Sequence, residues 1–293
     1  MRRLIRPSAT FSHSEKGSRV PAVGIDIGGT WIRIKGLADT GHPAFTLRRP
    51  MVSVSRLPAF LRRTFSHLGV HPDCLVIASR GVWTLEERRA YARPLKGLAK
   101  TVHVISDVEA AWFGAFGGGR SSILVISGTG SIALGSNARR YMARSGGLGP
   151  MLGDEGSAFW IGRQWIKMHA DYLARDSKLY RLGSRAATIK SIARVAPEVM
   201  DLARHGDRKA RFLIRRAQEH LAQFACEVSD SLELPYRVFI SWAGSVLLDP
   251  YFREGFMKTT VRLFHRRGQT VVWVPPKNDP VTAAARLALY GNF

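Results

Sequence analysis

The amino-acid sequence predicts an α/β protein built from two similar halves. Apolar runs of strand length alternate with segments of helical periodicity along most of the chain. A strand, a turn rich in Gly and Thr or Ser, and a returning strand occur around residues 26–30 and again around residues 127–131. No low-complexity linker divides the chain, so we expect its two domains to meet across a cleft.

The composition excludes several classes of protein. The chain has 293 residues, of which 45 % are hydrophobic, so each half can build an apolar core. No apolar run reaches the length that spans a bilayer, and we expect a cytoplasmic protein without a membrane partner. Cys74 and Cys226 are too few for a disulfide framework or a zinc site, which predicts buried free thiols in a reducing compartment.

The net charge of +22 has two explanations, which are polyanion binding and a generally basic surface. The basic residues occur as pairs spread along the chain, and no nucleic-acid recognition motif accompanies them. We therefore expect no specific nucleic-acid partner, and non-specific adhesion to polyanions at low salt.

Residues 1–20 are polar and basic without periodicity and predict a disordered leader, with an organelle transit peptide as the alternative. Residues 21–116 predict the first domain, in which alternating and continuous apolar runs indicate strands and amphipathic runs indicate helices. The expected strands are 22–25, 31–35, 45–48, 74–78 and 102–105, and the expected helices are 57–68 and 108–116.

Residues 117–279 predict the second domain, which repeats the pattern of the first. A final helix over 281–290 begins after Pro280, and the segment 280–293 can pack back onto the first domain. The expected strands of the second domain are 122–126, 132–135, 238–241 and 270–274, and its expected helices are 155–175, 184–204 and 208–232.

Both glycine-rich turns suit a phosphate, because glycines let backbone N–H groups approach an anion and a threonine hydroxyl adds a donor. Asp26 lies close enough to the first turn to help hold a hydrated Mg²⁺. Either turn alone would also fit an ordinary β-hairpin. Together they predict a site that holds a triphosphate from both sides, formed by Gly28, Gly29, Thr30, Gly128, Thr129 and Gly130.

Two further segments are candidate ligand contacts. Gly244 and Ser245 follow a third apolar strand, where a nucleotide base or ribose can lie against the backbone. Residues 146–163 concentrate six glycines and the pair Asp154 and Glu155 ahead of an apolar helix. This stretch predicts either a tight turn before a helix start or a backbone that passes close to a ligand.

Asp107 is the candidate catalytic acid. It ends a strand and starts a helix, a position from which a side chain can project into a cleft. Phosphoryl transfer needs a carboxylate that accepts the proton of the attacking hydroxyl. The alternative for Asp107 is a helix N-cap, and Glu109 is the rival acid, although it is better placed to stabilise the first helical turn.

Four segments now stand in order: DIGGT at 26–30, Ser106 with Asp107, ISGTGS at 126–131, and GGLGPMLGDEGSAFWIG at 146–162. Together they resemble the N-acetylglucosamine kinase family, within the BadF/BadG/BcrA/BcrD ATPase-like group of the actin-like superfamily. The resemblance covers residues 21–290, and ISGTGS followed by the GDEGS segment is its most specific part.

The resemblance implies two ribonuclease-H-like, actin-like ATPase domains around a nucleotide cleft. It implies ATP and Mg²⁺ as cofactors and transfer of the γ-phosphate to an amino sugar, N-acetylglucosamine or glucosamine, usually at O6. Many relatives are dimers, so a homodimer is a further expectation. By position, Asp107 resembles the general base, and Gly244 and Ser245 the adenosine side. The positions that resemble sugar contacts are Ser79, Asp107, Gly147, Leu148, Gly149 and Asp154.

Three residues depart from the family pattern. Leu148 stands where Trp is usual, Trp31 where Lys or Arg is frequent, and Arg80 within a turn that is usually small. Arg80 would either favour an acidic substituent on the sugar or point to solvent. An active kinase is the main hypothesis, and the alternative is a non-catalytic ATP-binding sensor or regulator that kept the fold.

Overall fold

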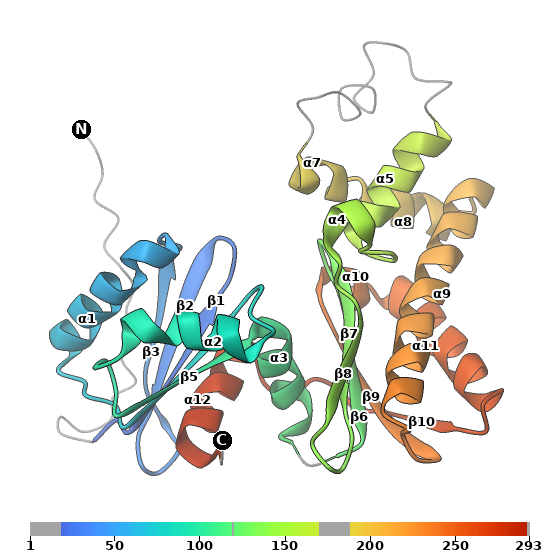
Figure 1. Ribbon diagram of the computed structural model, residues 1–293. Coiled ribbons are helices and arrows are strands. Elements are labelled where there is room, and N and C mark those ends of the chain that lie inside the picture. The colour runs from blue at the N-terminus through green and yellow to red at the C-terminus, as the bar shows by residue number, and fades with distance from the viewer. Residues whose placement is uncertain (1–18, 119, 170–187, 292–293) are drawn as a thin grey trace, which may run out of the picture. The chain divides into compact units, whose positions relative to one another are not determined.

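The computed structural model describes residues 19–118, 120–169 and 188–291. The chain forms two compact units (Figure 1). Unit 1 contains the described residues up to Gly117 and those from Lys277 onward, and unit 2 contains the described residues between Gly118 and Pro276. Most of the expected leader, residues 1–18, lies outside the described residues. No helix in these described ranges is long and apolar enough to cross a membrane.

Unit 1 is built on a five-stranded mixed sheet in the order β3-β2-β1-β4-β5. The first three strands form an antiparallel meander, and β1, β4 and β5 run parallel. The strands are β1 (Ala22–Ile27), β2 (Trp31–Leu37), β3 (Pro43–Pro50), β4 (Cys74–Ser79) and β5 (Thr101–Ser106).

The central strands of unit 1 are buried on both faces, as their continuous apolar runs predict. On one face, Ile25 and its neighbours pack against α1 (Leu57–Leu68). On the other, Val76 and Ala78 of β4 pack against α3 (Asp107–Phe116) and α12 (Pro280–Tyr290). The remaining helices of the unit are η1 (Val54–Arg56), α2 (Leu85–Ala92) and η2 (Arg93–Leu95).

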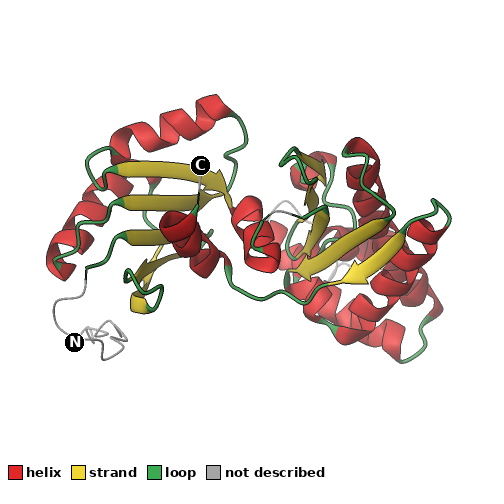
Figure 2. Ribbon diagram, turned by 90° about the horizontal axis from the view of Figure 1, so that it is seen from below, coloured by secondary structure: helices red, strands yellow, loops and turns green. Residues whose placement is uncertain are grey.

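Unit 2 repeats this topology with the strand order β10-β9-β6-β7-β8. Here β6, β7 and β8 form the antiparallel meander, and β6, β9 and β10 run parallel. Figure 2 shows the strands of each unit beside their helices. The duplicated α/β fold is therefore confirmed. The strands are β6 (Ser122–Ser127), β7 (Ser131–Ser136), β8 (Met142–Gly146), β9 (Arg237–Ala243) and β10 (Thr270–Trp273).

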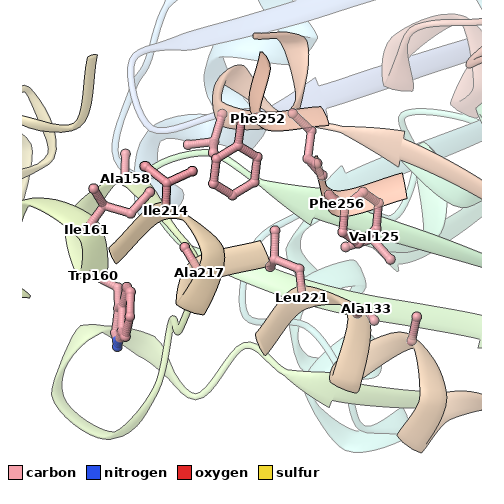
Figure 3. Packing of buried hydrophobic residues seen from close by; sticks show 14 of the residues in the cluster. Val125, Ala133, Ala158, Trp160, Ile161, Ile214, Ala217, Leu221, Phe252 and Phe256 are labelled. Carbon is pink, nitrogen blue, oxygen red and sulfur yellow. The ribbon is translucent and has the colours of Figure 1, made fainter. Parts of the chain in front are cut away.

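The core of unit 2 lies between one face of this sheet and a layer of helices around α9. Figure 3 shows Ile214 and Leu221 of α9 in the same apolar cluster as Phe252 and Phe256 of α11. The helices are α4 (Gly149–Leu152), α5 (Ala158–Met168), α7 (Ile189–Ala193), α8 (Ala196–Arg204), α9 (Arg208–Ser231), α10 (Ser245–Leu248) and α11 (Pro250–His265).

Several elements differ from the expectations. The single helix predicted over 184–204 is wrong, because α7 ends at Ala193 and α8 starts anew at Ala196, with Pro197 in its first turn. Residues 184–187, and residues 170–175 of the helix expected over 155–175, lie outside the described residues. The analysis of the sequence also missed β8 and α11. Cys226 is a buried free thiol, whereas Cys74 is half-buried.

Candidate functional site

The first glycine-rich turn joins β1 to β2 at the end of unit 1's central strand. Gly28 N–H donates to the carbonyl of Trp31 at 3.0 Å, which closes the turn. Met51 N–H donates to the Thr30 carbonyl at 3.0 Å, so the next segment also holds the turn in place. Gly29 and Thr30 are exposed, and their backbone groups remain accessible to a ligand.

Asp26 is the buried carboxylate beside this turn, with 5 % of its surface exposed. Its Oδ2 accepts a hydrogen bond from Arg33 Nη1 at 2.7 Å. Burial raises the pKa of Asp26 above its ordinary value, and the guanidinium of Arg33 opposes that rise. One carboxylate at a phosphate turn suits Mg²⁺, which keeps waters and phosphate oxygens as its other ligands. No cluster of three or more His, Cys, Asp or Glu side chains able to hold a metal occurs among the described residues.

The hydrogen bonds at the start of α3 show that Asp107 and Glu109 have different roles. Ser106, not Asp107, is the N-cap residue, and its Oγ accepts the Glu109 N–H at 3.1 Å. Glu109 in turn accepts the Ser106 N–H at 2.7 Å and forms an ion pair with Arg88 at 2.8 Å. The N-cap alternative for Asp107 is therefore wrong, and Glu109 serves the helix start.

Asp107 lies at the carboxyl end of β5 with its side chain 32 % exposed. Burial raises the pKa of its carboxyl group, while Arg80 and the N–H of Val108 oppose the rise. The Val108 N–H donates to Asp107 Oδ1 at 3.0 Å, and Arg80 Nε lies 3.6 Å from Oδ2. A partly exposed carboxylate with a raised pKa can accept a proton from a bound hydroxyl.

The other predicted residue of unit 1 is Ser79, at the end of β4. It is buried, and its hydroxyl donates to Tyr91 Oη at 3.4 Å. Ser79 pairs in register with Ile27 of β1 on one side and with Ser106 of β5 on the other. Unit 1 thus brings the first turn, residue 80 and Asp107 to the carboxyl ends of three adjacent parallel strands, where open α/β sheets bind ligands.

In unit 2, the second glycine-rich turn is fixed by the GDEGS segment that follows it in the sequence. Ser131 N–H donates to Asp154 Oδ1 at 3.2 Å, and Ser131 Oγ donates to the carbonyl of Glu155 at 2.6 Å. Ser127 Oγ donates to the Gly156 carbonyl at 2.8 Å. These bonds join the two motifs that carry the most specific part of the resemblance. Burial raises the pKa of Asp154, and the Ser131 N–H opposes the rise.

The predicted sugar-contacting segment begins beside the same turn. Gly147 N–H donates to the Ser131 carbonyl at 2.9 Å, and both Gly147 and Gly149 have positive φ. A Cβ at Gly147 would lie 2.6 Å from Ile132 Cδ1, so this position also needs a small residue. Leu148 is 64 % exposed. The backbone here is therefore close to the second turn, and the side chain at 148 faces outward.

Gly244 lies against the second turn from the other side. Its φ is 92°, and a Cβ there would lie 2.3 Å from the Ser127 carbonyl oxygen, so only glycine fits without a shift. Gly128 is correspondingly close to Ser245, with 3.7 Å between a Cβ at Gly128 and the Ser245 nitrogen. Unit 2 thus brings together the turn at 127–131 and Gly244 with Ser245, as expected for a nucleotide site.

A pocket of about 330 Å³ opens beside these residues. Thr129 and Ser245, both predicted nucleotide contacts, form part of its wall. The apolar part of the wall comes mainly from α7 and α8, which suits a flat heterocycle with a polar end. The pocket residues of α7 and α8 were not predicted from the sequence, because one continuous helix was expected there; Pro197 was the signal for the break. They are Lys190, Ala193, Arg194, Ala196, Pro197 and Met200.

Each unit holds its own part of the predicted contact set. In the second turn a Cβ at Gly130 would lie 2.9 Å from Asp154 Oδ1, and the pocket beside this turn has a volume of about 330 Å³. The predicted contacts of unit 1 are Asp26, Gly28, Gly29, Thr30, Ser79 and Asp107. The predicted contacts of unit 2 are Gly128, Thr129, Gly130, Gly147, Leu148, Gly149, Asp154, Gly244 and Ser245.

Comparisons with known proteins agree with this fold. The model of the BadF/BadG/BcrA/BcrD ATPase family matches residues 95–288. An N-acetylmuramic acid/N-acetylglucosamine kinase of Clostridium acetobutylicum is 46 % identical over 71 residues, which are 24 % of this chain and 23 % of that protein. The chain thus matches less than a quarter of the length of this curated relative.

Two solved structures have the same fold. A candidate N-acetylglucosamine kinase from Chromobacterium violaceum superposes with a TM-score of 0.66 at 24 % identity, over 90 % of this chain and 97 % of that one. A ROK family glucokinase from Streptomyces griseus, in complex with glucose and AMPPNP, superposes with a TM-score of 0.56 at 16 % identity, over 91 % and 98 % of the two chains. At these identities the likeness concerns the fold alone.

Proposed function

This chain belongs to the BadF/BadG/BcrA/BcrD ATPase family, and we propose that it is an ATP-dependent kinase of an amino sugar. The acceptor in this proposal is N-acetylglucosamine or glucosamine, phosphorylated at O6 in the cytoplasm. The names of the Clostridium and Chromobacterium proteins support the substrate class. The AMPPNP complex of the Streptomyces glucokinase supports nucleotide binding by this fold.

The proposal depends on one observation, that Glu109 serves the start of α3 whereas Asp107 does not. Glu109 is used by the helix cap and by Arg88, whereas Asp107 is not needed for capping. Asp107 lies at the carboxyl end of β5, and its carboxylate is 3.6 Å from the guanidinium of Arg80. We propose that Asp107 orients the acceptor hydroxyl and takes its proton as the hydroxyl oxygen bonds to phosphorus.

The proposed nucleotide contacts are the first glycine turn in unit 1, and the second glycine turn and the pocket in unit 2. Backbone N–H groups at 29–30 and 129–130 would bind phosphate oxygens, with Gly28 and Gly128 closing the two turns, and the pocket beside Ser245 would hold the base. Asp26 would hold Mg²⁺ through its coordinated waters, next to its bond with Arg33. When bound, Mg·ATP supplies the phosphoryl group, and the metal offsets its negative charge.

The proposed acceptor contacts include Asp107 in unit 1 and residues beside the second turn in unit 2. Ser79, Gly147, Gly149 and Asp154 remain proposed sugar contacts, and Leu148 would offer an aliphatic face to the ring. The exposure of Leu148 supports this, because an apolar side chain with 64 % of its surface in water gains from covering a sugar face. A homodimer belongs to the same proposal.

An ADP-release assay with Mg·ATP tests the proposal. The acceptors are N-acetylglucosamine, glucosamine, N-acetylmuramic acid, N-acetylmannosamine and glucose. Turnover with an amino sugar is expected, and Asp107→Asn should lower kcat by about 10²- to 10⁴-fold with nucleotide binding retained. Asp39→Asn, an exposed acid on the β2–β3 turn, is the matched control and should keep full activity.

Two results would contradict the proposal. Undiminished turnover by Asp107→Asn would remove the general-base assignment. ATP binding by the wild type without turnover on any of the five sugars would favour a non-catalytic ATP-binding sensor or regulator instead.

A further inference from the structure

Arg80 is the residue between the first glycine turn and Asp107. It follows β4 directly, and Gly81 after it has a φ of 68°. Its Nε lies 3.6 Å from Asp107 Oδ2. Its Nη1 lies 3.4 Å from the position that a Cβ would take on Gly29. One guanidinium group therefore spans the space from the candidate phosphate turn to the candidate base.

The sheet fixes this placement. Ile27, Ser79 and Ser106 are in register on the parallel strands β1, β4 and β5. The residues that follow them leave the sheet at the same edge, with Arg80 on the middle strand. Since all these residues belong to unit 1, the arrangement is a property of one compact body.

The guanidinium remains available to a ligand. Its side chain is 71 % exposed, and its 3.6 Å contact with Asp107 is longer than the 2.7 Å bond between Arg33 and Asp26. A charge pair at that distance and exposure is weak, because water screens it. A guanidinium group can bind a phosphate through two parallel hydrogen bonds. The single 3.6 Å contact between Arg80 and Asp107 is weaker than such a bidentate pair.

We propose that Arg80 binds the terminal phosphate of the nucleotide and stabilises the phosphoryl group during its transfer. This inference rests on the proposed kinase function. In that reaction the bond between the γ-phosphorus and the bridging oxygen of ADP breaks, and a bond from the acceptor oxygen to phosphorus forms. The acceptor proton goes to Asp107, and ADP leaves with the bridging oxygen. Arg80 offsets the negative charge of the phosphoryl group as it moves from the bridging oxygen of ADP to the acceptor oxygen.

The position of the guanidinium favours this role over recognition of an acidic acceptor. A carboxylate on an acceptor held by Asp107 would meet Arg80 from the side of its Nε, which lies 3.6 Å from Asp107 Oδ2. A phosphate in the first turn instead meets the Nη1 side that faces Gly29. The solvent-facing expectation for Arg80 is thus incomplete, because the exposed side chain also pairs with Asp107 and lies beside Gly29.

Nucleotide binding tests the proposal without any sugar. Calorimetric titration should show that the wild type binds Mg·AMPPNP more tightly than Mg·ADP. Arg80→Ala should lose this preference through AMPPNP binding weakened about tenfold or more, the order that a charge-assisted bond to phosphate provides. Mg·ADP affinity should change less than about twofold, and Arg80→Lys should recover part of the loss. Arg62→Ala, an exposed arginine on α1, is the control for net charge.

Turnover then separates the outcomes. Arg80→Ala should lower kcat about 10²-fold or more with neutral N-acetylglucosamine. Unchanged AMPPNP binding in a folded Arg80→Ala variant, or a loss confined to N-acetylmuramic acid, would overturn the assignment to phosphate. If the wild type phosphorylates none of the sugars, the proposed kinase function is refuted. If Arg80→Ala still loses the preference for AMPPNP over ADP in that case, the contact between Arg80 and the terminal phosphate stands.

Discussion

The carboxylate of Asp154 lies against Gly130, so that a Cβ added at Gly130 would stand 2.9 Å from Asp154 Oδ1. The same oxygen accepts the N–H of Ser131 at 3.2 Å. Gly130 has no positive φ, whereas Asp154 has a φ of 62°. The glycine is therefore required by the neighbouring carboxylate and not by its own backbone conformation.

Gly130→Ala should displace Asp154 and leave the buried Ser131 N–H without its acceptor. We expect a loss of about 1–3 kcal/mol in the free energy of unfolding, together with weaker ATP binding. Asp154→Gly removes the collision, so the double variant should be more stable than the sum of the single effects predicts. Chemical denaturation of the four proteins measures this coupling, and simple additivity would contradict it.

Gly24→Ala should destabilise unit 1. A Cβ at Gly24 would lie 2.1 Å from the backbone nitrogen of Ala285, so α12 would have to move off the sheet. Overpacking of this kind costs about 1–3 kcal/mol or more. Hydrogen exchange in α12 and thermal unfolding measure the effect. Because the collision is with backbone, Ala285→Gly should not restore stability, and a full rescue would refute this account.

Ala193→Phe should weaken ATP binding by filling the pocket of unit 2. Ala193 ends α7 and lines the same pocket as Thr129 and Ser245. We expect the KM for ATP to rise about tenfold, which corresponds to about 1.4 kcal/mol, with the KM for the sugar unchanged. Leu202→Phe adds the same ring at an exposed position of α8 and should have no effect. Equal changes in both variants would exclude the pocket as the base site.

The pH dependence of turnover should follow Asp107. Burial raises the pKa of its carboxyl group above 3.8. The positive charge of Arg80 opposes this rise, and the negative charge of Asp26 adds to it. A general base must be deprotonated, so kcat/KM should fall as the pH is lowered through this raised pKa. Arg80→Ala removes a positive charge, which should move the acid limb to higher pH. A limb that stays in place, or that moves to lower pH, would contradict the role of Asp107.

Much of the fold follows from local pattern. The helix predicted over 57–68 matches α1 in both bounds, because a strong amphipathic period begins near Pro58 and ends at Gly69. By contrast, β8 alternates only between exposed and half-buried residues, so it lacks the apolar period of a core strand. For α11, Asp249 and Pro250 were available as a start signal, but its few buried positions are separated by charged residues.

The candidate site also contains features that the local sequence predicts and features that depend on the tertiary fold. The glycine turns and Asp107 could be found in the sequence because their chemistry is local. The placement of the Arg80 guanidinium beside Gly29 could not be found there, since it depends on β4 lying between β1 and β5. The choice of Ser106 as the cap of α3 likewise required the hydrogen bonds themselves, because Ser106 and Asp107 are both good capping residues.

The assignment of α12 to unit 1 has a consequence for biosynthesis. A ribosome completes every residue of unit 2 before it reaches α12, so unit 2 can fold while the nascent chain is still growing. Until the last turn of α12 emerges, the face of the first sheet formed by Val76, Ala78 and Ile105 is covered by α3 alone. Unit 1 is thus the part of the nascent chain that remains exposed to chaperones and proteases until translation has passed Tyr290.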